Sequence, residues 1–189
     1  MKRNSLCALA AFSISSCVLA APQTYIIDGT HTYPMFEYNH LGFSMQTHRF
    51  TKTSGTITLD RIARAGSVQV AIDARSVDTG SKLFDKHIQG EDFFDTARFP
   101  SITFNSSRMQ FAGDRLVAVE GELTIKGVTR PVVLEVKSMQ CKPHPLRQKD
   151  ACGANAIAHV KRSEFNMSKH VPHVSDEVTL SIPVEAINE

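Results

Sequence analysis

Most of the signatures that tie a sequence to a particular chemistry are missing from these 189 residues. The sequence has no tryptophan, and it has no Gly-x-Ser-x-Gly, His-Glu-x-x-His or glycine-rich phosphate-binding motif. It has no run of lysine or arginine, so nothing indicates nucleic acid as a partner. Beyond the N-terminus, no stretch approaches the about 20 apolar residues of a transmembrane segment. These absences predict a protein that is not an enzyme, with no catalytic residue, no metal and no cofactor.

The first 20 residues have the composition of a secretory signal peptide. Lys2 and Arg3 precede a short apolar run, and small residues lead to a cleavage site after Ala20. A second interpretation is a lipoprotein box that ends at Cys17, which would then carry the lipid anchor. Both interpretations place residues 21–189 outside the cytoplasm, and we expect them in the periplasm.

Removal of the signal peptide changes the charge and the cysteine count. Lys+Arg falls from 21 to 19 while Asp+Glu stays at 19, so the exported chain is neutral with His uncharged. Cys7 and Cys17 leave, and only Cys141 and Cys152 remain. Two cysteines in an exported chain predict one disulfide across a loop. A zinc site would need two further ligands close by.

Alternation of apolar and polar residues is the strongest structural signal in 21–189. Period two predicts antiparallel strands with one buried and one exposed face, and glycine-containing turns separate them. We expect one all-β domain over 21–189, an extended antiparallel barrel of about eight strands, because closure removes exposed sheet edges. The inward residues expected in the longest alternating segment are Val117, Val119, Gly121, Leu123 and Ile125.

Only 79–95 departs from this alternation. Leu83, Phe84, His87 and Ile88 recur there at helical spacing. The segment predicts one short helix, or a pair of helical turns, inserted between two strands.

The interior of such a barrel has two interpretations. About eight strands enclose a space that side chains fill, or that holds one slim ligand. The inward residues are mostly aliphatic, with Phe36, Phe50, Phe104 and Phe111 as aromatic additions. A hollow interior of this kind favours a hydrocarbon over a sugar, a nucleotide or a metal ion. Periodicity alone does not separate a hollow interior from a solid core.

Several motifs, taken together, resemble the YceI-like polyisoprenoid-binding proteins. They extend over the whole of 21–189 in that family's order: Asp28-Gly-Thr-His31, Phe36-Glu-Tyr-Asn-His40-Leu-Gly, Ser76-Val-Asp-Thr-Gly80, Asp85-Lys-His87, Asp92-Phe-Phe-Asp95, Phe99-Pro-Ser-Ile-Thr-Phe104, Gly121-Glu-Leu-Thr-Ile-Lys-Gly-Val-Thr-Arg-Pro131, Arg162-Ser-Glu-Phe-Asn-Met167 and Asp176-Glu-Val-Thr-Leu180.

The resemblance implies an extended, lipocalin-like barrel whose apolar lumen takes the isoprenoid tail of a lipid or quinone in the periplasm. True lipocalins carry a Gly-x-Trp signature, which a sequence without tryptophan cannot have. Homodimers occur among such relatives. We expect the ligand to contact Phe36, Tyr38, Phe50, Phe93, Phe94, Phe104, Leu123, Val178 and Leu180.

We expect a polar rim of His40, Asp85 and His87 around this lumen. Each has a structural alternative, because buried polar groups are usually paired within the protein and an Asp at a helix end often caps it. His170 and His173 lie close together and would suit a surface metal, but no further ligand is evident, and their role stays open.

The expected function is a non-enzymatic carrier or reservoir for an isoprenoid lipid or quinone. One alternative is an interaction or accessory protein with a filled barrel, acting in stress or electron transfer. A less favoured alternative is a hydrolase or isomerase of lipid head groups, which requires His40, Asp85 and His87 to meet at one rim.

Overall fold

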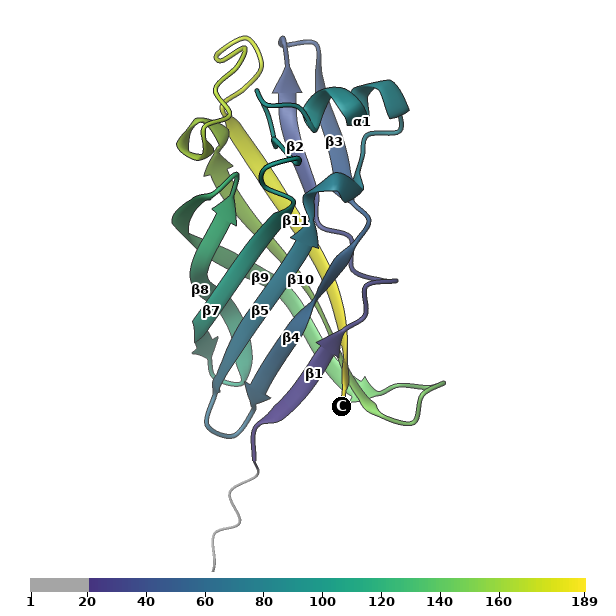
Figure 1. The fold of residues 1–189 in the computed structure, drawn as a ribbon. Coiled ribbons are helices and arrows are strands. Elements are labelled where there is room, and N and C mark those ends of the chain that lie inside the picture. The colour runs from purple at the N-terminus through teal and green to yellow at the C-terminus, as the bar shows by residue number, and fades with distance from the viewer. Residues whose placement is uncertain (1–20) are drawn as a thin grey trace, which may run out of the picture.

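The structure is a computed structural model that describes residues 21–189. The predicted signal peptide and Cys17 lie outside the described residues. The elements (Figure 1) are, in chain order, β1 (Gln23–Ile27), β2 (Met35–His40), β3 (Ser44–Phe50), β4 (Thr53–Asp60), β5 (Ala65–Asp73), η1 (Ala74–Ser76), β6 (Val77–Asp78), α1 (Lys82–Ile88), β7 (Ser101–Ala112), β8 (Arg115–Ile125), β9 (Val128–Pro143), β10 (Asp150–Lys161), η2 (Arg162–Phe165) and β11 (Glu177–Asn188).

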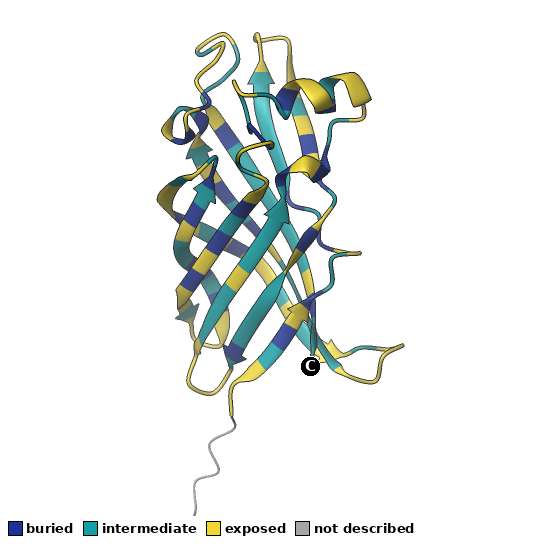
Figure 2. Ribbon diagram, viewed as in Figure 1, coloured by how far each residue is buried: buried dark blue, intermediate teal, exposed yellow. Residues whose placement is uncertain are grey.

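Eight of the strands form a closed antiparallel barrel. They follow one another in the order β1-β4-β5-β7-β8-β9-β10-β11, and β1 also pairs with β11. The predicted all-β barrel of about eight strands with one helix is therefore confirmed. Along β7, buried and exposed residues alternate as dark and light bands (Figure 2), which is the period-two pattern of its sequence.

One edge of strand β11 pairs with β10 along its length, and the other edge has a different partner at each end of the strand. Its last residues pair with β1, with Ala186 opposite Ile27. Its first half pairs with β2, with Leu180 opposite Phe36, and β2 continues the sheet through β3 to β6. One short strand therefore borders β11 at one end of the barrel, and three strands extend the sheet from it at the other.

We call these two ends the closed end and the mouth end. The closed end, at the bottom of Figure 1, carries the turns at 61–64, 113–114 and 144–149. The mouth end, at the top, carries the β2–β3 turn at 41–43, helix α1 and the loop 166–175. No helix in the described part of the chain has the length and apolar character that a bilayer crossing requires.

Helix α1 is shorter than the segment that departs from the alternation. It begins after Ser81, whose hydroxyl accepts a hydrogen bond from Phe84 N, and it ends at Ile88. The chain then continues in turns up to Pro100. The turns fold back on the helix, since Phe94 N donates to Ile88 O at 3.0 Å. The prediction of one short helix within 79–95 is confirmed.

A bulge changes the inward face of β8. Gln110 pairs with Ala118 and Phe111 pairs with Leu116, so Val117 is an extra residue in this strand. Leu116 contributes to the wall of the interior and Val117 does not. The expectation that Val117 points inward is wrong, because strict alternation cannot anticipate a bulge.

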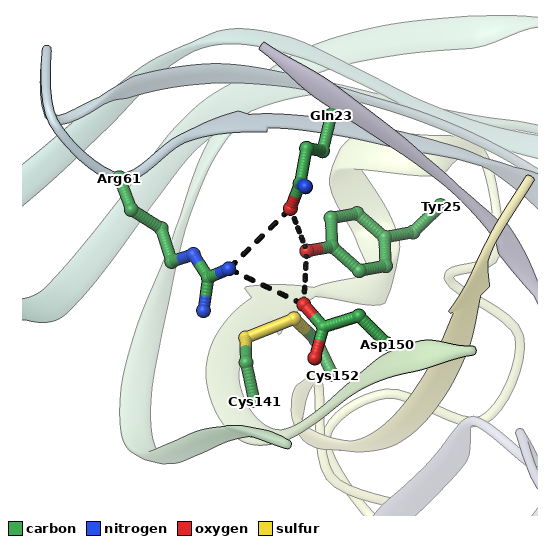
Figure 3. The surroundings of a disulfide bond; sticks show 6 residues. All are labelled: Gln23, Tyr25, Arg61, Cys141, Asp150 and Cys152. Carbon is green, nitrogen blue, oxygen red and sulfur yellow. Dashed lines mark hydrogen bonds and ion pairs between the residues drawn. A yellow bond between two sulfur atoms is a disulfide. The ribbon is translucent and has the colours of Figure 1, made fainter. Parts of the chain in front are cut away.

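A disulfide and a polar cluster lie at the closed end (Figure 3). Cys141 of β9 and Cys152 of β10 are directly opposite in register and are bonded, which confirms the predicted pairing. The Tyr25 hydroxyl lies 2.9 Å from an Asp150 carboxylate oxygen, and Arg61 reaches the same oxygen at 3.3 Å. Burial, and then Asp150, raise the pKa of Tyr25.

Candidate functional site

A cavity of about 390 Å³ occupies the barrel interior. This volume lies in the range of about 300–1,000 Å³ that small-molecule sites span. Its wall is predominantly aliphatic and comes from strands all around the barrel: Val68, Val70, Ile72, Ile102, Leu116, Val119, Leu123, Ile125, Leu134, Val136, Val178, Leu180, Ile182 and Val184.

The inward side chains of this region do not meet at the barrel axis. Val70, Leu134, Leu180 and Ile182 line the cavity, yet each is only half-buried. Inward residues of a solid core would be buried completely, as Tyr25 is at the closed end. Of the two interpretations of the interior, the hollow one holds for most of the barrel and the filled one for the closed end.

Aromatic rings gather in the part of the cavity nearest the mouth end. The ring of Phe94 lies 5.7 Å from that of Phe36 and 5.4 Å from that of Phe50, in both cases edge to face. Phe84 and Phe93 also line this region. Edge-to-face pairs stabilise one another, so these rings form a defined wall.

Phe104 depends on a glycine in the neighbouring strand. A Cβ atom on Gly121 would lie 2.5 Å from Phe104 Cζ, so only glycine leaves room for this ring over β8. The ring is buried and lines the cavity.

All nine residues that the sequence predicted as apolar contacts line the cavity: Phe36, Tyr38, Phe50, Phe93, Phe94, Phe104, Leu123, Val178 and Leu180.

The cavity reaches solvent at the mouth end. Among its lining residues, the exposed ones are His40, His87, Lys169 and His170. They come from the end of β2, helix α1 and the loop 166–175. The structure therefore places His40 and His87 of the predicted polar rim at the opening, together with two residues that the rim prediction omitted.

Asp85, the third residue of the predicted rim, does not line the cavity. Its buried carboxylate accepts hydrogen bonds from Thr79 N at 2.7 Å and Thr79 Oγ1 at 2.8 Å, and it contacts Lys82 at 3.2 Å. The Thr79 backbone donor is the main cause that lowers the pKa of Asp85. The sequence left open whether Asp85 has a structural role, and these contacts at the start of α1 show that it has one. Because Asp85 does not reach the cavity, His40, Asp85 and His87 form no shared reactive centre.

Tyr38 and His48 form a buried polar pair beside the cavity. The Tyr38 hydroxyl, on a lining residue, shares a 3.2 Å hydrogen bond with His48 Nε2. His48 is buried against Phe36 and Phe84, and its Nδ1 has no partner. Burial lowers the pKa of His48, opposed by the charges of Asp85 and Asp78, and burial raises the pKa of Tyr38.

A buried arginine lies in the wall near the opening. Arg162 donates to the backbone carbonyls of Ser175 at 2.8 Å, of Val174 at 2.9 Å and of Lys169 at 2.9 Å, and also to that of Met167. No carboxylate of residues 21–189 forms an ion pair with it. Burial lowers the pKa of Arg162. Its guanidinium holds the loop 166–175 in place and adds positive charge to the polar end of the cavity.

The two histidines of unassigned role lie in that same loop. His170 lines the opening, and the His173 carbonyl accepts a hydrogen bond from Leu41 N at 3.0 Å, which ties the loop to the β2–β3 turn. Within 21–189, no group of three or more His, Cys, Asp or Glu side chains is arranged to hold a metal ion.

The sequence reasoning missed His48 and Arg162. His48 lies two positions before Phe50 on β3, so period two from Phe50 would have assigned it to the inward face. Arg162 opens one of the motifs that carry the family resemblance, but nothing in its spacing indicates that its donors are bound to backbone carbonyls.

Comparison with known proteins identifies relatives along the whole chain. A YceI-like domain matches residues 25–186. Proteins named YceI from Salmonella arizonae and Salmonella paratyphi B are 36% identical over 192 residues, covering 100% of each chain. Burkholderia cenocepacia BcnA has a TM-score of 0.73 at 28% identity, covering 85% of this chain and 99% of that one. A polyisoprenoid binding domain from Saccharophagus degradans shares the fold, with a TM-score of 0.69 at 20% identity over 88% of this chain and 99% of that one. The chain belongs to the YceI-like family.

Proposed function

We propose that the protein is a periplasmic carrier or reservoir that encloses an isoprenoid lipid, or the isoprenoid tail of a quinone, in its barrel. The observation that carries this proposal is the cavity of about 390 Å³, which is apolar except near its opening. The description of the Saccharophagus degradans relative as a polyisoprenoid binding domain supports the same ligand class. The predicted signal peptide supports the periplasm.

Transfer of apolar surface out of water would supply the affinity. Each CH₂ group moved from water into an apolar interior contributes about 0.8 kcal/mol. Much of the wall offers no hydrogen-bonding side chain, so a sugar or nucleotide would lose its hydrogen bonds to water without replacing them. A hydrocarbon loses none.

The predicted apolar contacts would then bind the tail, and the polar groups would orient the head group. Phe36, Phe93 and Phe94 would enclose the part of the tail nearest the opening. Tyr38 and Arg162 lie where a head group with hydrogen-bond acceptors, such as a quinone carbonyl or a phosphate, would end. Their contribution would be to specificity more than to affinity, because the tail carries most of the apolar surface.

The two alternatives have less support. An accessory protein with a filled barrel does not fit the half-buried lining residues. A head-group hydrolase or isomerase would need the rim carboxylate of Asp85, which is bound to Thr79 instead. A carrier without catalysis therefore accounts best for the geometry.

Binding of geranylgeraniol, a short isoprenoid alcohol, tests the proposal. We expect the protein to bind it and a Phe104→Asp variant to bind it at least about tenfold more weakly, because a charge in the lumen must be desolvated. Phe104→Leu is the matched control, and its affinity should stay close to that of the parent. A folded Phe104→Asp protein with unchanged affinity, or a parent protein that binds no geranylgeraniol, would contradict the proposal.

A further inference from the structure

The cavity ends before the barrel does. Along β11 its lining residues extend from Val178, toward the mouth end, to Val184, and Ala186 is already buried in the filled closed end. Six residues of a strand span about 20 Å, and the depth along the barrel axis is smaller because barrel strands are tilted. A hydrocarbon chain that enters at the mouth end therefore meets a floor after a limited distance.

Three side chains separate the cavity from the filled end: Met109, Phe111 and Met139. Each packs against the large cluster that includes Phe104 of the cavity wall, and each also packs against the cluster of the closed end that includes Tyr25. None of the three lines the cavity. They lie at the boundary of the hollow and filled parts, and we call them the floor residues.

Strand pairing places two of the floor residues directly beside the cavity wall. Met139 of β9 lies opposite Ala154 of β10, and Phe111 of β7 lies opposite Leu116 of β8. Ala154 and Leu116 both line the cavity. The cavity therefore ends within one residue pair of Met139 and of Phe111.

Bulges bring the floor residues to the inward face. Strand β7 has an extra residue between Asn105 and Arg108, and β9 has one at Lys137. In both strands the lining residues precede the bulge and the floor residues follow it. Strict alternation from Val136 would turn Met139 outward, and the extra residue turns it inward. The interior thus changes from hollow to filled just beyond the bulges.

The composition of the floor suits the end of a hydrocarbon tail. Two methionines and a phenylalanine present no charge and no hydrogen-bond donor. Tyr38 and Arg162 contribute their polar groups to the cavity wall near the opening. A ligand with a polar head and an apolar tail would therefore bind with the head at the opening and the tail end at the floor.

We propose that the floor residues determine which isoprenoid tail length the barrel binds best, and that Met139 limits the depth of the lumen beside Ala154. The inference rests on the proposed function for the class of ligand. A tail that just reaches the floor transfers all of its apolar surface out of water. A longer tail must leave its excess in water or fold back, so the added length contributes no further affinity.

Dissociation constants for a series of isoprenoid alcohols test the inference. Geraniol, farnesol, geranylgeraniol and geranylfarnesol each differ by one isoprene unit, and solanesol is much longer. In the parent protein, the affinity should rise at least about tenfold with each added unit, because each unit buries further carbon atoms. The rise should stop at the alcohol whose tail reaches the floor, and solanesol should bind no more tightly than that alcohol.

Two variants should move this limit in opposite directions. Met139→Ala removes part of the floor, so the rise should continue to a longer alcohol. Ala154→Leu adds atoms on the cavity side of the floor, so the rise should stop at a shorter one. Both residues are half-buried, and we expect both variants to fold. Ala154→Leu provides the test alone should Met139→Ala fail to fold.

Met167→Ala is the matched control for Met139→Ala. It removes the same atoms from the cavity wall in the loop 166–175, near the opening. We expect it to change the affinity for all the alcohols by a similar factor and to leave the limit at the same alcohol as in the parent protein.

Three results would overturn the inference: affinity that keeps rising up to solanesol in the parent protein, an unchanged limit in the folded floor variants, or an equal shift in Met167→Ala. Straight-chain alcohols test the floor separately from the proposed function, because a limit of depth applies to any hydrocarbon. A limit that shifts in Met139→Ala for straight-chain alcohols, with no binding of isoprenoid alcohols, would contradict only the proposed function. Geranylgeraniol binding without any shift would contradict only the role of the floor.

Discussion

The closed end and the hollow part of the barrel are built from the same alternating pattern, but only one of them is filled. At the closed end, Tyr25, Ile27, Leu59 and Ala186 are buried against one another and against neighbouring side chains. Farther along β11, Leu180 lines the cavity and remains half-buried. An apolar inward face therefore does not by itself make a solid core.

The strands that border β11 distinguish the two regions. At the closed end the single strand β1 bridges β11 and β4, with Tyr25 opposite both Asn188 and Ile57, and its side chains fill the narrow interior. Toward the mouth end, β2, β3 and β6 extend the sheet from β11. A cavity remains there between the inward side chains. The strand that pairs with β11 therefore differs between the filled end and the binding site.

Truncation of one leucine in each region tests this contrast most strongly. Leu59 is 3% exposed, so Leu59→Ala should lower the free energy of unfolding by about 2–5 kcal/mol, the usual cost of a new cavity in a packed core. Leu180→Ala removes the same atoms beside an existing cavity and should cost less than about half as much. Urea unfolding of both variants gives the comparison, and equal losses would contradict it.

The disulfide should stabilise the closed end without affecting the cavity. Replacement of both Cys141 and Cys152 by serine should lower the free energy of unfolding by up to about 3 kcal/mol, because the bond closes a short loop in the unfolded chain. Affinity for geranylgeraniol should not change. Thermal melts with and without reductant provide the measurement, and identical melting would refute a stabilising role.

Enlargement of an alanine in each region should have opposite consequences. Ala154 lines the cavity and is half-buried, so Ala154→Leu should fold normally and weaken geranylgeraniol binding by occupying the lumen. Ala186 is buried in the filled end, so Ala186→Leu should cost about 1–3 kcal/mol of stability through overpacking. A similar loss of stability in both variants would mean that the lumen has no room for the added atoms.

The smallest effect concerns pH and the mouth end. Because burial lowers the pKa of His48 below its ordinary value of 6.5, the unfolded chain binds this proton more readily than the folded protein does. This group's contribution to stability is complete above pH 6.5 and is lost as the pH falls below that value. The free energy of unfolding should therefore decrease between pH 6.5 and about 5 in the parent protein and decrease less in His48→Gln. Equal slopes would show that His48 does not titrate differently on folding.

The sequence predicted the barrel and most of its wall because both follow from period two. Phe104, Leu123 and Leu180 could be assigned to the interior from alternation and from the family resemblance. Val117 could not be placed correctly, because the bulge that puts Leu116 inward depends on the pairing between β7 and β8.

The polar groups of the site were harder to predict, because each depends on contacts distant in sequence. Asp85 carries a charge near the opening, yet Thr79 binds its carboxylate and keeps it out of the cavity wall. The sequence alone would assign Arg162 to the surface, but in the structure the loop 166–175 covers it and accepts hydrogen bonds from its guanidinium. The hollow and filled parts of the interior go with the pairing of β11 with β2 at one end and with β1 at the other. A local sequence pattern cannot predict these pairings.

Mass spectrometry of a solvent extract tests the central claim most directly. The protein would be purified from its native cells without detergent, extracted with organic solvent and compared with an Ala154→Leu variant treated in the same way. The account predicts an isoprenoid lipid or quinone at close to one molecule per barrel in the parent protein and much less in the variant. An extract without isoprenoid, or equal amounts from both proteins, would contradict it.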